Sequence, residues 1–207
     1  MLAISAPAMA QDSDSEFDGF RVEALAGYDV NKAGSSVDDD TNPDNDQSIE
    51  GLSYGIGVGY DYDAGGVVLG LEAELADSTA DVDIDAADPD YLGFGNVGAG
   101  RDIYVGARVG FKANDDLLVY GKGGYTNARY DFRVGTDEVD GRLDADGWRV
   151  GAGLEYAMSG NTFAKVEYRY SNYTSAEIDY EGNVPDVDVG EIDLDRHQVM
   201  AGFGVRF

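Results

Sequence analysis

Apolar and polar side chains alternate with a period of two along most of the chain. The last segment shows this most clearly, because one of its faces is apolar and the other is small or polar. Its apolar positions are Val199, Ala201, Phe203, Val205 and Phe207. Successive side chains of an extended strand point to opposite faces, so the pattern predicts a β-strand with one apolar face. The stretch 52–62 repeats it over eleven residues, a length that suits a tilted transmembrane strand.

Eight stretches of the chain show this alternation. They lie at about 18–31, 50–63, 67–82, 98–112, 117–132, 146–158, 162–177 and 193–207. Three of the connections, at 63–66, 113–116 and 159–161, are short and rich in turn-forming residues. The other four are long, at about 32–49, 83–97, 133–145 and 178–192. The predicted fold class is therefore all-β: an eight-stranded antiparallel up-and-down transmembrane β-barrel with short periplasmic turns and long extracellular loops.

The direction of the apolar face separates a membrane barrel from a soluble one. A soluble barrel points its apolar face inward, whereas a membrane barrel points it at lipid. Aromatic residues of the apolar face gather near both strand ends, as at two membrane interfaces. These girdle residues are Phe20, Tyr60, Tyr62, Phe111 and Tyr156 toward the short turns, and Tyr28, Tyr54, Trp148 and Tyr170 toward the long loops. The opposite face is rich in glycine, which leaves room for long side chains inside a narrow barrel. We therefore predict that the apolar face meets lipid.

Charged residues in mid-strand then point into the lumen. The bases are Arg21, Arg108, Lys122, Arg149, Lys165, Arg169, Arg196 and Arg206, and the acids are Glu23, Glu72, Glu74, Glu155 and Glu167. Buried charges are tolerated when they are paired. We expect a packed plug of ion pairs, since an eight-stranded barrel is narrow enough for side chains to fill. The alternative is a narrow pore lined by cations.

The formal net charge of -27 argues against a nucleic-acid partner, because binding phosphates requires Lys and Arg. The acidic excess falls in the four predicted loops, which predicts a strongly negative extracellular surface. The chain has no cysteine, so disulfides and thiolate metal sites are excluded. Asp81, Asp83 and Asp85 offer oxygens of the kind that calcium prefers, as do Asp186 and Asp188. We interpret both groups as solvated acidic faces and predict no metal site, with bridging by divalent cations as the alternative.

The first ten residues are small and apolar, and an Ala-Met-Ala sequence ending at Ala10 matches a signal-peptide cleavage site. We interpret 1–10 as the remnant of a cleaved signal peptide, 11–16 as an N-terminal tail and 17–207 as the barrel. A plain apolar N-terminus is the alternative for the first segment. The sequence has no run of 18 apolar residues, so a form that spans the membrane must be a closed barrel.

A catalytic role finds little support in the sequence. The single histidine, His197, has Arg196 and Gln198 as neighbours rather than a nucleophile. The glycine-rich stretches 55–59 and 121–124 do not precede a helix in a βαβ unit, so they are strand glycines and not phosphate loops. We predict no catalytic residue and no cofactor.

The chain resembles the eight-stranded bacterial outer-membrane barrels of the OmpA type and, more closely, the opacity-protein or surface-antigen group. The resemblance covers about 17–207 and rests on the final alternating strand that ends at Phe207, on the girdles and on the alternation of turns and loops. It implies that Phe203, Val205 and Phe207 form a C-terminal insertion signal. The barrel-insertion machinery would read that signal.

We expect a non-enzymatic protein of the bacterial outer membrane with a structural or surface-interaction role, such as envelope integrity, adhesion or surface antigen. A small porin, or a carrier for small or apolar molecules, is the alternative, and a lipid-modifying rim enzyme is a remote one. The expected partners are outer-membrane lipid, lipopolysaccharide and the insertion machinery. An extracellular ligand at the acidic loops, held directly or through divalent cations, is a further expectation.

Overall fold

The structure is a computed structural model that describes residues 15–33, 48–79, 81–83, 94–134, 139–158, 161–180 and 187–207. The described residues form nine β-strands: β1 (Gly19–Ala33), β2 (Ser48–Asp63), β3 (Val67–Ser78), β4 (Asp81–Asp83), β5 (Phe94–Lys112), β6 (Leu117–Val134), β7 (Val139–Met158), β8 (Thr162–Tyr180) and β9 (Val187–Arg206). The predicted signal-peptide remnant and all of the acidic residues at 34–47 and 84–93 lie outside the described residues. Within the described residues, no helix has the length and apolar character needed to cross a membrane.

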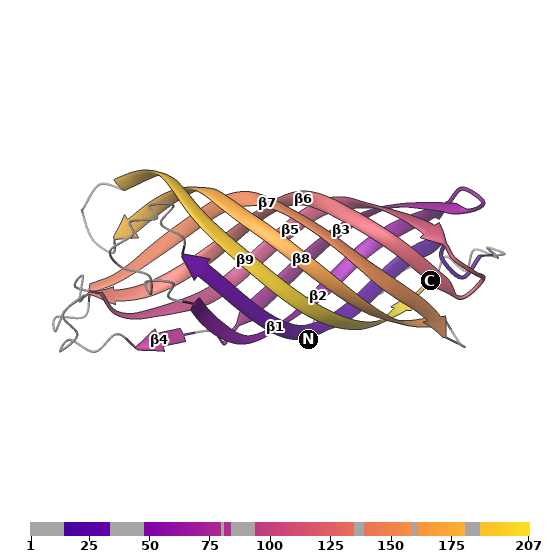
Figure 1. The fold of residues 1–207 in the computed structure, drawn as a ribbon, viewed down its shortest axis with the longest axis horizontal. Helices are drawn as coiled ribbons and strands as arrows, with labels where there is room; N and C mark the ends of the chain where they lie inside the picture. The colour runs from indigo at the N-terminus through magenta and orange to yellow at the C-terminus, as the bar shows by residue number, and fades with distance from the viewer. Residues whose placement is uncertain are drawn as a thin grey trace, which may run out of the picture.

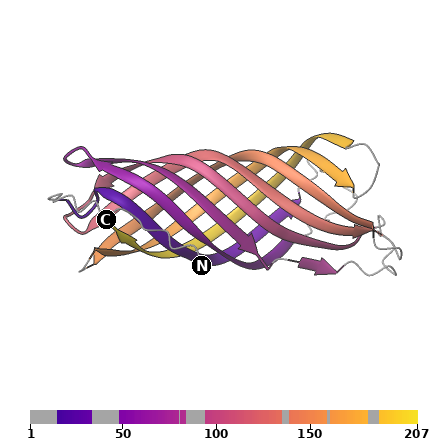
Figure 2. The same ribbon diagram turned by 180° about the vertical axis from the view of Figure 1, so that it is seen from behind.

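The strands form a closed antiparallel barrel (Figures 1 and 2). Except at β4, each strand pairs with the next one along the chain, and β1 pairs with β9 to close the ring. The short β4 pairs with the same strand as β3. β3 pairs with residues 102–111 of β5, and β4 pairs with residues 96–98 of β5. β3 and β4 therefore form one interrupted wall strand, and the barrel has eight wall strands. The predicted fold class is confirmed.

The side chains of β3 show which way the wall faces. Its exposed and buried residues alternate along the strand. Leu71 is 69% exposed, whereas the neighbouring Glu72 is 4% exposed. The apolar side chains thus point away from the barrel and the charged ones point into it, the reverse of a soluble barrel.

Tight turns join the strands at one end of the barrel, where the C-terminus also lies (Figure 1). Between β2 and β3, Gly65 and Gly66 have φ values of 87° and 152°, a backbone conformation that favours glycine. Asn161 precedes β8 with a φ of 63°, which asparagine tolerates better than most residues. These positions belong to turns that the sequence predicts.

The last two long connections are shorter than predicted, because the strands continue past the expected ends. β7 begins at Val139, β8 ends at Tyr180 and β9 begins at Val187, so most of 133–145 and most of 178–192 are strand. The expectation that the acids of these stretches lie in loops is therefore wrong for part of them. Of the acids in the predicted loops 83–97, 133–145 and 178–192, those found in strands are Asp83, Asp140, Asp144, Asp179, Asp188 and Glu191.

Cross-strand register explains why such charged stretches remain paired. Arg129 of β6 lies opposite Asp144 of β7, and its Nε and Nη2 each donate to one carboxylate oxygen at 3.1 Å. The backbone register continues with Asp131 opposite Arg142. Opposite charges in register support strand pairing in water, so the ladder does not have to stop where the apolar alternation ends.

Candidate functional site

The lumen holds a balanced set of charges. All thirteen charged residues assigned to it from the sequence are buried, each with at most 6% exposure. Three further acids, Asp29, Asp61 and Asp102, are buried with them. The buried set therefore contains eight bases and eight acids, five predicted and three additional, and its formal charge is zero. Each of the eight wall strands contributes at least one member.

Near the short-turn end, Asp61 of β2 accepts hydrogen bonds from three guanidinium groups. Arg21 donates from Nε at 3.1 Å, Arg108 from Nη2 at 2.6 Å and Arg206 from Nη2 at 3.0 Å. Glu155 of β7 accepts from Arg108 and Arg206, both at 2.7 Å. This layer links β1, β2, β5, β7 and β9 across the barrel.

The middle layer is built around Lys122 of β6. Its Nζ lies 2.7 Å from Glu74, 2.8 Å from Glu72 and 3.0 Å from Glu167. The same Nζ lies 4.5 Å from the centre of the Tyr104 ring, a cation–π contact. The ammonium group therefore joins β3 and β8, each of which lies two wall strands away from β6.

Lys165 and Arg169 of β8 complete the middle layer. Lys165 Nζ lies 2.8 Å from Glu23 of β1, and Arg169 Nη1 lies 2.9 Å from Glu74 of β3. Arg21 Nη1 also contacts Glu23 at 2.7 Å, which connects this layer with the one near the turns. The two layers form one continuous network.

The layer nearest the long loops is centred on Asp102 of β5. Arg196 of β9 donates to it at 2.7 Å and to Asp29 of β1 at 2.9 Å. Arg149 of β7 also pairs with Asp102 and donates from Nε to Ser171 at 2.7 Å. Arg196 thus spans the lumen from one wall to the other.

An apolar cluster lies inside the barrel at the short-turn end. Phe17, which precedes β1, is fully buried there with Val68, Leu118, Tyr120 and Ala157. Arg206 holds this segment in place. Its Nη1 donates to the carbonyl of Glu16 at 2.7 Å, and its guanidinium lies 5.7 Å from the centre of the Phe17 ring.

Comparison with known proteins identifies the family. Residues 1–207 match the model of the outer membrane protein beta-barrel domain. The chain belongs to this family. It is therefore a protein of the bacterial outer membrane.

Several relatives share this barrel domain. The 31 kDa outer-membrane immunogenic protein of Brucella melitensis is 30% identical, over 98% of this chain and 89% of the relative. The 22 kDa outer membrane protein of Rhizobium leguminosarum is 32% identical, over 75% of this chain and 68% of the relative. This outer-membrane barrel is thus homologous to immunogenic surface proteins.

Solved structures share the fold at low sequence identity. Neisserial surface protein A has a TM-score of 0.57 at 17% identity, and the alignment covers 91% of this chain and 97% of that one. Ail, the attachment invasion locus protein of Yersinia pestis, has a TM-score of 0.51 at 16% identity, with coverages of 92% and 99%. These likenesses show the barrel fold alone.

The outer face of the outer-membrane barrel carries the residues assigned to the girdles. Eight of the nine are exposed, and Tyr170 is half-buried, with its hydroxyl donating to Asp195 at 2.7 Å. Tyr125 and Tyr168 are exposed on the same face and were not assigned to a girdle. Trp148 packs edge-on against Tyr170 with ring centres 5.4 Å apart.

The C-terminal residues assigned to an insertion signal belong to the closing seam. Phe203 and Phe207 are exposed on the outer face, and Val205 is half-buried. The backbone of Phe207 exchanges two hydrogen bonds with Phe20, at 2.8 and 3.1 Å. The last residue is therefore tied to the first strand.

His197 lies on the outer face of β9 and not in the lumen. Its Nδ1 is 2.7 Å from the hydroxyl of Tyr168, and its ring centre is 5.2 Å from that of Tyr170. Among the described residues, no group of three His, Asp or Glu side chains is placed to hold a metal ion. Of the predicted acidic groups, Asp85 and Asp186 lie outside the described residues.

The sequence missed three members of the network, although two signals pointed to them. Asp29, Asp61 and Asp102 share the inward parity of Arg21 and Arg108 on their own strands or on paired ones. In addition, eight bases against five acids leave three charges uncompensated, which a buried network does not tolerate. If the buried network is required to have no net charge, the eight predicted bases imply three inward acids in addition to the five predicted ones.

Proposed function

We propose that this outer-membrane barrel is a structural, surface-exposed protein with a closed lumen, and that it acts in envelope integrity, adhesion or as a surface antigen. The neutral network of sixteen buried charges carries the proposal. An aqueous pore would leave many of these groups facing water. Here they face one another across the barrel instead.

Two further observations support a closed lumen. The layers around Asp61, Lys122 and Asp102 follow one another along the barrel, and each joins side chains of different wall strands across the lumen. Phe17 and its apolar neighbours are packed together inside the barrel at the short-turn end. An eight-stranded barrel has an interior that side chains can fill completely.

The outer surface is the other part of the proposed role. The relatives named as immunogenic proteins support a surface that other molecules meet, and we place that surface at the long-loop end. An extracellular ligand there would meet a mainly acidic surface, directly or through divalent cations. Lipopolysaccharide would surround the wall, and Phe203, Val205 and Phe207 would address the chain to the insertion machinery.

The proposed role is non-enzymatic. His197 supports this, because its Nδ1 is engaged by Tyr168 on the outer face. A hydrolase would place its histidine beside a nucleophile within hydrogen-bond reach. A small porin or carrier is the alternative that the conductance test addresses.

Conductance across a planar bilayer tests the closed lumen. The native protein is expected to give no current steps. The triple variant Arg108→Ala, Arg169→Ala, Arg196→Ala removes one guanidinium from each layer and is expected to conduct. The matched variant Arg101→Ala, Arg129→Ala removes outward cations and is expected to stay silent. Stable current steps from the native protein would show a pore and contradict the proposal.

A further inference from the structure

A segment that is not part of the wall enters the lumen at the short-turn end. It comprises Ser15–Asp18, which precedes β1, and we call it the strap. Its backbone turns on itself, because the amide of Asp18 donates to the carbonyl of Ser15 at 3.4 Å. Phe17 is fully buried, whereas the neighbouring Glu16 is exposed. The strap therefore turns its aromatic ring inward and leaves a charged residue in contact with water.

The ring of Phe17 lies among side chains from distant parts of the wall. Its buried cluster includes Leu118 and Tyr120 of β6, Val68 of β3 and Ala157 of β7. β6 is opposite β1 in the ring, because β9, β8 and β7 separate them on one side and β2, β3 and β5 on the other. A residue that precedes β1 thus shares a cluster with the facing wall. Such a position is the one that a plug would occupy.

Gly19 provides the bend between the strap and β1. Its φ is 119°, a backbone conformation that L side chains rarely adopt and that glycine adopts freely. A Cβ at this position would lie 2.2 Å from the carbonyl oxygen of Phe207. Glycine therefore lets the chain turn into the lumen while the next residue, Phe20, still pairs with Phe207.

Polar contacts fasten the strap on both sides of its own strand. The Ser15 hydroxyl donates to the carboxylate of Asp63, and the carboxylate of Asp18 accepts from the Asp63 amide at 2.9 Å. Arg206 Nη1 donates to the carbonyl of Glu16 at 2.7 Å. Asp63 belongs to β2 and Arg206 to β9, the two strands that flank β1. The strap is thus tied down across the β1 end of the barrel.

Arg206 also connects the strap with the first charged layer. Its Nη2 donates to Asp61 at 3.0 Å and to Glu155 at 2.7 Å. The strap contacts Asp63, which lies nearer the turn than Asp61 on the same strand. Water that entered from the short-turn end would therefore meet the strap before it met these carboxylates. Ion pairs are stronger where water is kept away from them.

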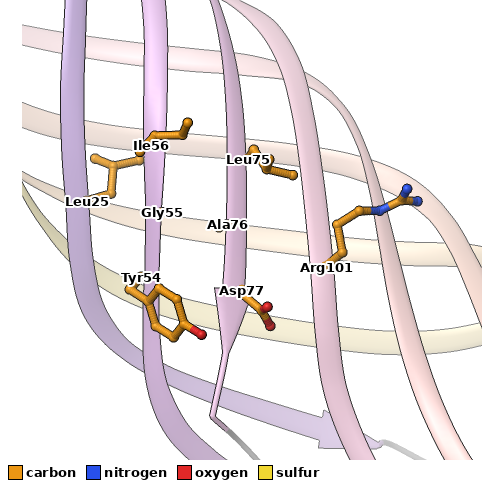
Figure 3. Close-up of a pocket in the computed structure, with 8 residues that line it drawn as sticks. All are labelled: Leu25, Tyr54, Gly55, Ile56, Leu75, Ala76, Asp77 and Arg101. Atoms are coloured by element: carbon orange, nitrogen blue, oxygen red, sulfur yellow. The ribbon is translucent and has the colours of Figure 1, made fainter. Parts of the chain in front are cut away.

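The seat of Phe17 differs from the hollow on the outer face of the wall. That hollow has a volume of about 450 Å³ and is bordered by exposed apolar residues such as Ile56 and Leu75 (Figure 3). Arg101 also borders it, but its guanidinium donates to Asn127 at 3.0 Å. The membrane itself meets that face. Inside the lumen, only the chain can supply an apolar side chain to cover an apolar cluster, and Phe17 does so.

We propose that the strap seals the short-turn end of the lumen and leaves or re-enters its seat by a hinge at Gly19. In its seat, it keeps water from the layer around Asp61. Out of its seat, it opens this end of the lumen to water. The proposal goes beyond the closed lumen proposed above, because it concerns one end of the barrel and has its own measurement.

Thiol access in the purified full chain in micelles tests the seal, and the lack of cysteine in the chain allows single reporters. Val68→Cys places a thiol in the seat of Phe17, and Met200→Cys places one deeper, opposite Glu167 of the middle layer. The reagent is a small, charged methanethiosulfonate. Adding Phe17→Ala is expected to speed the reaction of Val68→Cys about tenfold, because access to a buried group follows the population of the open form. It is expected to leave the reaction of Met200→Cys unchanged.

Matched variants separate the seal from the loss of any aromatic ring. Phe20→Ala removes the same ring from the outer face, where the residue is 47% exposed, and is expected to leave both rates unchanged. Gly19→Ala is expected to act like Phe17→Ala, since its Cβ would collide with Phe207. Heat-modifiable mobility on unboiled gels shows that each variant is folded. If Phe17→Ala does not fold, Ser15→Ala with Asp18→Ala removes both side-chain contacts to Asp63 instead.

Two results would overturn the proposal. Equal rates for Val68→Cys with and without the ring of Phe17 would mean that the strap does not control access. Equal acceleration of both reporters would mean that Phe17 contributes only to the general stability of the barrel. A fast reaction of Met200→Cys in the otherwise native chain would contradict the closed lumen instead, and acceleration of Val68→Cys by Phe17→Ala would still support the seal.

Discussion

The inner and outer faces of the wall are built from the same strands and obey opposite rules. On β3 the side chain of Leu71 points to lipid and that of Glu72 points to a network of cations. The outer face needs only to be apolar, and many residues satisfy that need equally well. The inner face needs a partner for every charge, so each of its residues depends on particular others. The inner face should therefore be far less tolerant of change than the outer one.

Removing an inner acid should have the largest effect. Asp61→Asn keeps the shape of the side chain but leaves Arg21, Arg108 and Arg206 without their shared carboxylate. We expect a loss of about 3–5 kcal/mol in the free energy of unfolding, measured by urea titration in micelles. Asp77→Asn, the same change on the outer face of β3, is the control and should have little effect. Equal losses in the two variants would remove the distinction between the faces.

A charge on the outer face should have the next largest effect. Leu71→Arg places a guanidinium where lipid is expected, and we expect a loss of about 2–4 kcal/mol in lipid vesicles. Leu71→Ile is the matched control and should unfold like the native chain. A harmless Leu71→Arg would mean that this face does not meet hydrocarbon.

A methyl group added to the inner face should cost less than an unpaired charge. A Cβ at Gly202 would lie 2.8 Å from Cγ of Lys165 and 3.1 Å from Leu25. We expect Gly202→Ala to lower the free energy of unfolding by about 1–3 kcal/mol, because the neighbours must shift. Gly121→Ala adds a methyl group to the outer face of β6, where the nearest atom would be 3.8 Å away, and it should be tolerated. Similar unfolding midpoints for both variants would argue against a tightly packed lumen.

The smallest effect is expected from the ion pair between Arg129 and Asp144, which is partly exposed. A double-mutant cycle with Arg129→Ala and Asp144→Ala should give a coupling of about 0.2–1 kcal/mol in urea titrations. The coupling should fall as salt is raised, since exposed charges are screened. A coupling as large as the Asp61 effect would mean that the β6–β7 hairpin is not in water.

The period-two pattern was enough to predict the eight wall strands, their faces and thirteen inward charges. It failed where its physical basis changes. Beyond the apolar band, β6 and β7 stay paired where opposite charges, rather than alternating apolar residues, lie in register. The alternation ends there, and Val139–Ala145 was therefore predicted to be part of a loop.

The long sequence separations within the lumen network determine how the protein must fold. Lys165 meets Glu23 across 142 residues, and Arg206 meets Asp61 across 145. An open sheet that entered the membrane early would expose these groups unpaired to hydrocarbon, at a cost that rises with every inward charge. The pairing of β9 with β1 brings both ends of such contacts together. Ring closure and entry into the bilayer must therefore proceed as one cooperative event, and a chain stalled before its last strand would have no stable place in the membrane.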